Sequence, residues 1–274
     1  MRFLFKITDF LVALLLRYVL KYRLKVIRNN LEGSFKYVSR KDREHDVWQN
    51  YLYLAKVLRQ IIAVPSKRLL ERRMHLVPNP SIDLWLSEGK SVIVTFGHTG
   101  NWEWTGSYLG VRYPDQVCAL YKKIKSRRVN DHMYNRRLTH VNYLIETKQM
   151  GELLRLMKKK PILILMIADQ NPGSAQGSIW TSFLGRNTAF VNGPESLALR
   201  YDLPVVYAYT TPEKDGGYTI ECREIYNGKD AVAPGEITGR FARSLEENIQ
   251  EFRSHWLWSH KRWKRKAQTV PQPL

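Results

Sequence analysis

The chain has 274 residues, and its 44 Lys and Arg against 25 Asp and Glu give a formal net charge of +19. This length suffices for one large or two small domains, and the charge predicts association with polyanions such as nucleic acid, anionic lipid or an acidic protein. The two cysteines, Cys118 and Cys222, belong to no metal or redox spacing, which argues against disulfides and favours a reducing compartment.

The first predicted element is an amphipathic helix over residues 1–28. Its apolar run, Phe10 to Leu16, is too short to span a bilayer because charged residues bracket it. Apolar side chains fill most of the helical projection, and an arc of about 100° holds the charged residues Arg2, Lys6, Asp9, Arg17, Lys21 and Arg28. This pattern is typical of a helix in a membrane interface, and a terminal helix packed on its own domain is the alternative. We therefore expect a membrane-associating helix over 1–28 and one larger domain, which would carry any catalytic site, over 29–274.

Beyond three helices at 41–64, 66–74 and 80–87, strand-like and helical segments alternate along the chain. Strands are expected at 91–96, 117–121, 142–145, 162–167, 205–209 and 218–222, with an irregular segment at 169–188. Further helices are expected from residue 101 and at 126–138, 148–159, 193–200 and 237–252. This alternation predicts one α/β domain with a central, mostly parallel sheet flanked by helices.

A histidine and a carboxylate follow the strand at 91–96. His98 lies in the expected turn, Asn101 is placed to cap the next helix, and Glu103 falls in its first turn. A carboxylate there can hold one imidazole nitrogen while the other removes a proton from an attacking hydroxyl. The alternative is a hydrogen-bonded loop histidine beside a helix cap.

Two cationic segments stand out. The first follows the strand at 117–121, where α/β proteins place their sites, and contains Lys122, Lys123, Lys125, Arg127, Arg128, Arg136 and Arg137. The second, Trp256 to Lys266, mixes three tryptophans with cations, which favours an interface. A solvated charged face is the alternative for either segment.

The sequence lacks the motifs that are typical of several enzyme classes. It has no Gly-x-Ser-x-Gly elbow, no P-loop, no Gly-x-Gly-x-x-Gly, no His-Glu-x-x-His and no Cys-x-x-Cys. We therefore expect no metal and no nucleotide cofactor. A lone base that activates the hydroxyl of a bound acceptor remains, and it needs an activated donor such as a thioester.

Five motifs in order resemble those of the bacterial lipid A secondary (late) acyltransferases. They are Gly97-His-Thr-Gly-Asn-Trp-Glu-Trp104, Ala168-Asp-Gln170, Phe183-Leu-Gly185, Gly193-Pro194 and Trp256-Leu-Trp-Ser-His-Lys-Arg-Trp263. That family sits in the wider lysophospholipid acyltransferase superfamily, which is defined by His-x4-Asp/Glu. The resemblance runs from about Leu11 to Lys266, which is nearly the whole chain.

The resemblance implies an enzyme on the cytoplasmic face of the inner membrane that moves a fatty acyl chain from acyl carrier protein to a hydroxyl of a lipid acceptor, most simply a lipid A precursor. His98 matches the base of the family and Glu103 the acid that orients it, while Asp169 and Gln170 match a motif near the active site. We expect Asn101, Asp169 and Gln170 to contact the substrate. From the cationic residues themselves, we expect Lys122, Lys125, Arg127 or Arg128 to hold a phosphorylated acceptor. The net positive charge favours an acidic carrier protein as the donor.

Two alternative functions remain. One is a lysophospholipid acyltransferase, acting on a glycerolipid or aminolipid, with the same base and a different acceptor. The other is a non-enzymatic basic protein that binds lipid or nucleic acid. Since the chain carries no recognised nucleic-acid module, we expect no nucleic-acid partner.

Overall fold

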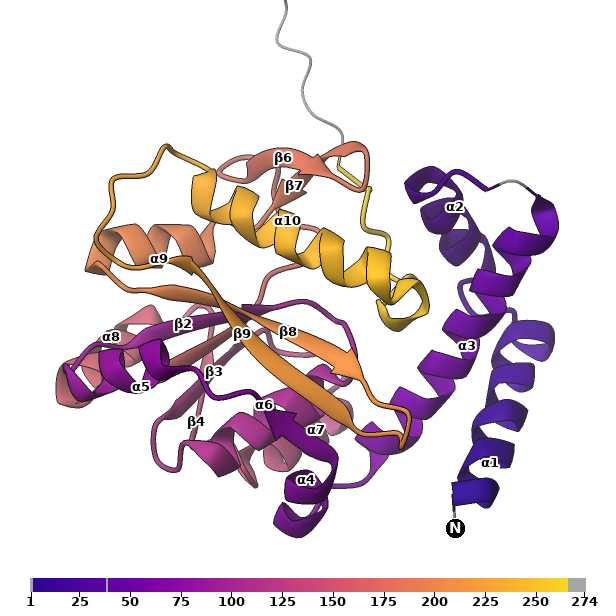
Figure 1. Ribbon diagram of the computed structural model, residues 1–274, viewed down its shortest axis with the longest axis horizontal. Coiled ribbons are helices and arrows are strands. Elements are labelled where there is room, and N and C mark those ends of the chain that lie inside the picture. Colours follow the sequence, from indigo (N-terminus) through magenta and orange to yellow (C-terminus); the bar gives the residue numbers. More distant parts are fainter. Residues whose placement is uncertain (1, 38, 266–274) are drawn as a thin grey trace, which may run out of the picture.

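A seven-stranded, mostly parallel sheet forms the centre of the computed structural model, which describes residues 2–37 and 39–265 (Figure 1). Its strand order is β1-β9-β8-β2-β5-β3-β4, and β9 runs antiparallel to β8. The bounds are Met74–Leu76 for β1, Val92–Phe96 for β2, Val117–Tyr121 for β3, Tyr143–Glu146 for β4, Leu163–Ile167 for β5, Val205–Pro212 for β8 and Tyr218–Tyr226 for β9. The predicted α/β class is thus confirmed.

Helices cover both faces of this sheet. Every residue of β2 is buried, and its side chains alternate: Ile93 packs into one core, whereas Val92, Val94 and Phe96 pack into the other. The core that contains Ile93 is completed by α8 (Met150–Lys159), α9 (Gly193–Tyr201) and α10 (Glu236–Glu251). The opposite core is completed by α4 (Lys67–Arg73), α5 (Pro80–Ser87) and α6 (Trp102–Arg112), while α7 (Arg127–Leu138) contacts β4.

The segment expected to be irregular contains a β-hairpin. Strands β6 (Ile179–Phe183) and β7 (Arg186–Phe190) pair antiparallel across a two-residue turn. Leu184 and Gly185 occupy this turn with φ of 51° and 72°, which is the backbone of a type I′ connection. Leucine at a positive φ is an uncommon turn residue, so the sequence carried little signal for the hairpin.

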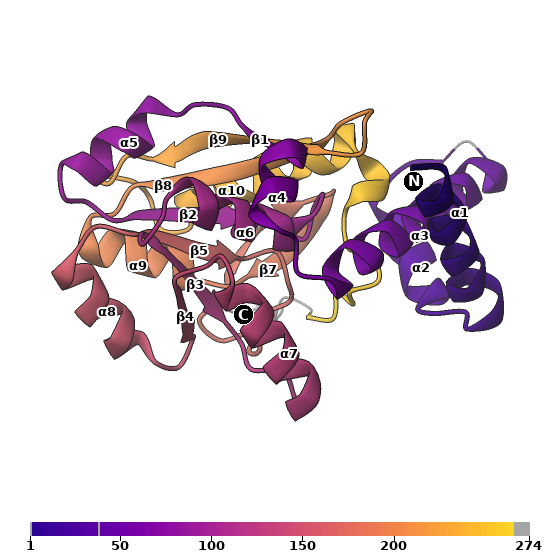
Figure 2. The same cartoon turned by 90° about the horizontal axis from the view of Figure 1, so that it is seen from below.

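The amino-terminal helices stand beside the sheet rather than over it (Figures 1 and 2). Helix α1 (Arg2–Leu14) continues into a π-helix (Leu15–Val19), and α2 (Leu24–Ser34) and α3 (Arg40–Ile62) follow. The helical conformation is interrupted between the π-helix and α2, where Arg23 has a φ of 54°. Residues 2–28 therefore do not form the single helix that the apolar pattern predicted for 1–28.

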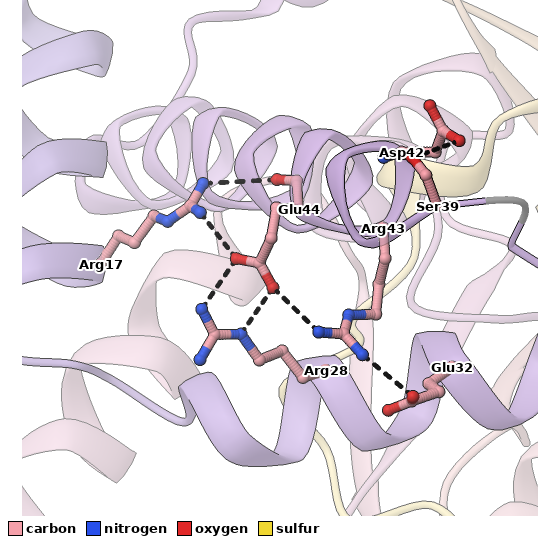
Figure 3. A network of polar contacts seen from close by, with 7 residues as sticks. All are labelled: Arg17, Arg28, Glu32, Ser39, Asp42, Arg43 and Glu44. Atoms are coloured by element: carbon pink, nitrogen blue, oxygen red, sulfur yellow. Dashed lines mark hydrogen bonds and ion pairs between the residues drawn. The ribbon is translucent and has the colours of Figure 1, made fainter.

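Three charged residues of this segment, Asp9, Arg17 and Arg28, pair with α3, whereas Lys6 and Lys21 are exposed (Figure 3 shows Arg17 and Arg28). Arg17 and Arg28 both bind the carboxylate of Glu44 on α3, at 2.8 Å and 2.7 Å, and Asp9 pairs with Arg59 at 2.6 Å. The apolar side leaves a row of exposed side chains, which includes Leu4, Leu11, Leu15, Tyr18, Val19, Leu20 and Tyr22. No helix among residues 2–37 and 39–265 is long and apolar enough to cross a bilayer.

Candidate active site

The site forms where two neighbouring parallel strands end. Strands β2 and β5 pair with Phe96 opposite Ile167, and His98 and Asp169 each lie two residues beyond that pair. The carboxyl ends of parallel strands meet at one edge of a sheet, so the two side chains lie together although 71 residues separate them.

The imidazole of His98 is held by the carboxylate of Asp169. Nδ1 of His98 lies 2.7 Å from Oδ1, and Oδ2 accepts the backbone N–H of His98 at 2.9 Å and the indole N–H of Trp256 at 2.7 Å. Burial opposes ionisation of this carboxyl, yet the charge and hydrogen bonds of His98 and the Trp256 bond lower the pKa of Asp169 to about 2. An ionised Asp169 requires a proton on Nδ1, which leaves the lone pair of Nε2 available as a base.

Nε2 of His98 lies at a large cavity. The cavity measures about 710 Å³, which is within the usual range for small-ligand sites, and the His98 side chain is 15% exposed. The amide nitrogen of Gln170 lies 3.1 Å from Nε2. Apolar surface dominates the part of the cavity lined by Gly106, Ala119, Leu120, Val141 and Leu165.

Glu103 does not hold the imidazole, which corrects the expectation from the sequence. Arg137 binds it at 2.5 Å and 3.1 Å, and Arg136 binds it at 3.0 Å. Burial opposes its ionisation, but the Arg137 hydrogen bonds and the charges of the two guanidinium groups lower the pKa of Glu103. Among the described residues, Glu103 makes no hydrogen bond to His98, although both line the cavity. The carboxylate on Nδ1 is Asp169, which the sequence placed only near the site.

Asn101 caps α6, as predicted. Its Oδ1 accepts the backbone N–H of Trp104 at 3.1 Å, and its Nδ2 donates to Gln60 at 3.0 Å. The side chain is fully buried and is not among the described residues that line the cavity. Its contacts are therefore those of a helix cap, rather than the substrate contact we expected.

The cationic run after β3 divides into two groups. Lys122 and Arg137 line the cavity. Arg127 and Arg128 are exposed on α7, and Arg127 pairs with Asp131 at 3.7 Å. These two arginines are therefore exposed and are not among the described residues that line the cavity.

The tryptophans of the carboxy-terminal segment pack in the core, so the interface predicted for them is wrong. Trp256 and Trp258 are 1% and 0% exposed. The backbone next to them pairs with the His98 loop: Leu257 N–H donates to His98 C=O, and Gly100 N–H donates to His255 C=O. The segment thereby fixes the loop of the base and, through the Trp256 indole, the carboxylate of Asp169. The sequence signal available for this was the alternation of Trp256 and Trp258, which is typical of a buried extended segment.

Residues 1–265 match the model of the bacterial lipid A biosynthesis acyltransferase family. The chain belongs to this family. A search of curated proteins gave no match. The family match confirms the resemblance found in the sequence, and it makes the protein an acyltransferase of lipid A biosynthesis, with a lipid acceptor and an acyl donor.

Proposed function

We propose that this acyltransferase moves a fatty acyl chain from the thioester of acyl carrier protein to a hydroxyl of a lipid A precursor, with His98 as the general base. The observation that carries the proposal is the pair of His98 and Asp169 at the wall of a partly apolar cavity. The Asp169 carboxylate fixes the tautomer of the ring and stabilises the imidazolium that forms during the reaction.

The chemical step follows from the unprotonated lone pair of Nε2, which the Gln170 amide contacts at 3.1 Å. The acceptor hydroxyl gives its proton to Nε2 of His98 while its oxygen attacks the thioester carbonyl carbon. The tetrahedral intermediate then breaks its C–S bond, and the leaving thiolate takes the proton back from the imidazolium. The Gln170 amide, 3.1 Å from Nε2, is within reach of the acceptor oxygen or of the oxyanion.

Glu103 has a supporting role in this proposal. It pairs with the buried Arg136 and the part-buried Arg137, and it orients Arg137, which lines the cavity together with Lys122. Two arginines against one carboxylate leave the cluster with a net positive charge, which favours anionic groups in the cavity.

The apolar part of the cavity is the natural place for the acyl chain. Its wall consists of small and branched side chains from α6, β3 and β5, which can exclude water from a fatty acyl chain. The net charge of +19 and the exposed Arg127 and Arg128 support an acidic carrier protein as the donor.

The exposed apolar row on α1 and the π-helix supports a protein that rests on the cytoplasmic face of the inner membrane. Ion pairs hold the charged side of these helices against α3, so the apolar side is free to enter the lipid interface. The lipid acceptor would then reach the site without leaving the membrane surface.

The test is acyl transfer by purified protein from acyl carrier protein to a lipid A precursor. His98→Ala should lower kcat by about 10²–10⁴-fold while the thermal unfolding midpoint stays near that of the wild type. Near-wild-type turnover by folded His98→Ala protein would disprove the mechanism. Transfer to a lysophospholipid but not to the lipid A precursor would disprove the acceptor.

A further inference from the structure

A second cavity of about 520 Å³ lies next to the catalytic one. The two cavities share the wall segment 171–173, which directly follows Gln170. The remaining lining comes from the break before α2 and from the carboxy-terminal segment, and it comprises Tyr22, Arg23, Leu257, Ser259, His260, Lys261, Lys264 and Arg265. We call this the basic cavity.

Positive charge dominates the basic cavity. Arg23, Lys261, Lys264 and Arg265 contribute four cations, and none of the described residues that line it is acidic. Arg265 donates to the backbone carbonyls of Pro172 and Gly173, which orders the shared wall. No ion pair to Arg23, Lys261 or Lys264 is found among residues 2–37 and 39–265, so these charges are available to an anion.

His260 adds a neutral hydrogen-bond donor to the wall. Its Nε2 accepts the backbone N–H of Asn171 at 3.1 Å, and burial lowers the pKa of its imidazole. A neutral ring that accepts at Nε2 carries its proton on Nδ1, and Nδ1 donates to no group in the described part of the chain. His260 therefore links the basic cavity to the segment that follows the catalytic Gln170.

The position of the basic cavity relates it to the membrane. Its residues Tyr22 and Arg23 follow Lys21, and Lys21 follows Tyr18, Val19 and Leu20, which are 58–71% exposed at the end of the apolar row. A lipid at that surface would meet apolar side chains, the basic cavity and the catalytic cavity in sequence.

We propose that the basic cavity binds a phosphate group of the lipid acceptor and so presents the acceptor hydroxyl to His98. The inference rests on the proposed function and assigns the acceptor phosphate to Arg23, Lys261 and Lys264 instead of the run from Lys122 to Arg128. A phosphate matches a cavity with several cations and no carboxylate, because each phosphate oxygen accepts charge-assisted hydrogen bonds. Membrane phospholipid and the acidic carrier protein are the other possible anions.

The test is the double variant Lys261→Gln with Lys264→Gln, assayed with a phosphorylated lipid A precursor and with the same lipid after phosphatase treatment. We expect the KM for the phosphorylated acceptor to rise about tenfold or more, with the donor KM unchanged. With the dephosphorylated acceptor, the variant and the wild type should have the same KM. The control Lys158→Gln with Lys159→Gln makes the same charge change on exposed positions of α8 and should behave as the wild type.

Three outcomes would overturn the proposal. A higher donor KM with an unchanged acceptor KM would assign the cavity to the carrier protein. Weaker binding to phosphatidylglycerol vesicles with both KM values unchanged would assign it to the membrane surface. If neither KM value nor vesicle binding changes, the cations of the basic cavity bind none of these anions and are merely solvated.

Direct binding keeps this test separate from the proposed function. The phosphorylated lipid in neutral detergent micelles can be titrated against His98→Ala protein with and without the two Lys→Gln changes. A phosphate-dependent loss of affinity supports the basic cavity even if turnover shows another acceptor. An equal affinity in both proteins contradicts it even if His98 proves to be the base.

Discussion

At the scale of single residues, the imidazole of His98 is fixed through both its ring and its backbone. Asp169 binds Nδ1 and the His98 N–H, and Trp256 donates to the same carboxylate. Glu103 instead lies between two arginines. The two carboxylates of the site therefore have different tasks, one on the base and one on the cations, and variants of each can separate them.

Asp169→Asn should lower kcat by about 10²–10⁴-fold with little change in either KM, because an amide N–H facing Nδ1 moves the ring proton to Nε2 and removes the base.

Glu103→Gln should show the opposite pattern, with a lower thermal midpoint and a higher KM, because it leaves the buried Arg136 without its counter-charge. The measurements are steady-state kinetics and thermal unfolding of both variants. If kcat falls in Glu103→Gln and not in Asp169→Asn, Glu103 is the carboxylate that orients His98, as the sequence predicted.

Asp169 should also make the fold sensitive to acid. Its pKa falls from an unfolded value near 4 to about 2, so its stabilisation is present above pH ~4 and is lost as the pH falls towards 2. The shift corresponds to about 2 kcal/mol. Between pH 5 and pH 2.5, Asp169→Asn should therefore lose less of its thermal midpoint than the wild type, whereas the exposed control Asp230→Asn should follow the wild type. Parallel curves for wild type and Asp169→Asn would contradict this assignment.

At the scale of elements, α6 joins the site to the apolar part of the cavity. Its first turn carries Glu103, and Gly106, one turn later, lines the cavity. A Cβ at Gly106 would lie 3.6 Å from Leu165, so a small side chain fits and a larger one must extend into the cavity. The length of acyl chain that the cavity accepts should therefore depend on this position.

Gly106→Leu should shift the preference of the enzyme towards shorter acyl chains, because the added side chain fills space that the distal end of the chain would use. The measurement is kcat/KM for acyl carrier protein loaded with a series of chain lengths. Gly151→Leu, at an open position on α8, is the control for the change in helix propensity. An equal loss for every chain length would mean that Gly106 serves packing alone.

The exposed start of α7 is a separate element with a separate test. Arg127→Glu with Arg128→Glu should raise the KM for acyl carrier protein and flatten its dependence on salt, because charge reversal removes attraction to an acidic partner. Lys158→Glu with Lys159→Glu is the matched control. If the acceptor KM rises and the donor KM does not, the pair binds acceptor phosphate, and if neither moves, it is a solvated face.

At the scale of the whole molecule, ion pairs decide which side of the amino-terminal helices is free. Glu44 binds Arg17 and Arg28, and Arg59 binds Asp9, so these three charged side chains are paired within the protein (Figure 3 shows the two pairs of Glu44). The exposed apolar row, the basic cavity and the catalytic cavity then follow one another across the molecule.

Leu11→Glu with Val19→Glu should weaken binding to vesicles of phosphatidylethanolamine and phosphatidylglycerol without lowering the thermal midpoint, because both side chains are more than half exposed. The measurement is vesicle flotation in high salt, where apolar insertion persists and charge attraction is screened. Leu84→Glu with Leu199→Glu changes two exposed residues on other helices and should float as the wild type does. Full retention of the Leu11 and Val19 variant would exclude this row as the anchor.

The sequence by itself determined those features that depend on neighbours along the chain. Alternating apolar runs located, to within a few residues, six of the nine strands found in residues 2–37 and 39–265. Asn101 marked the start of α6 because its side chain caps the helix that it precedes. The order of the five motifs sufficed to place the chain in its family.

Tertiary structure decided which of these features meet. Strand β5 follows β4 along the chain but pairs with β2 and β3, and this pairing brings Asp169, rather than the nearer Glu103, to His98. Arg17, Arg28 and the tryptophans of the carboxy-terminal segment have the composition of interfaces, yet residues distant in the chain pair or bury them. The type of a side chain determines what it can bind. Its actual partner lies far away in the sequence, so only the packing of the sheet and helices determines which charged group or aromatic ring it contacts.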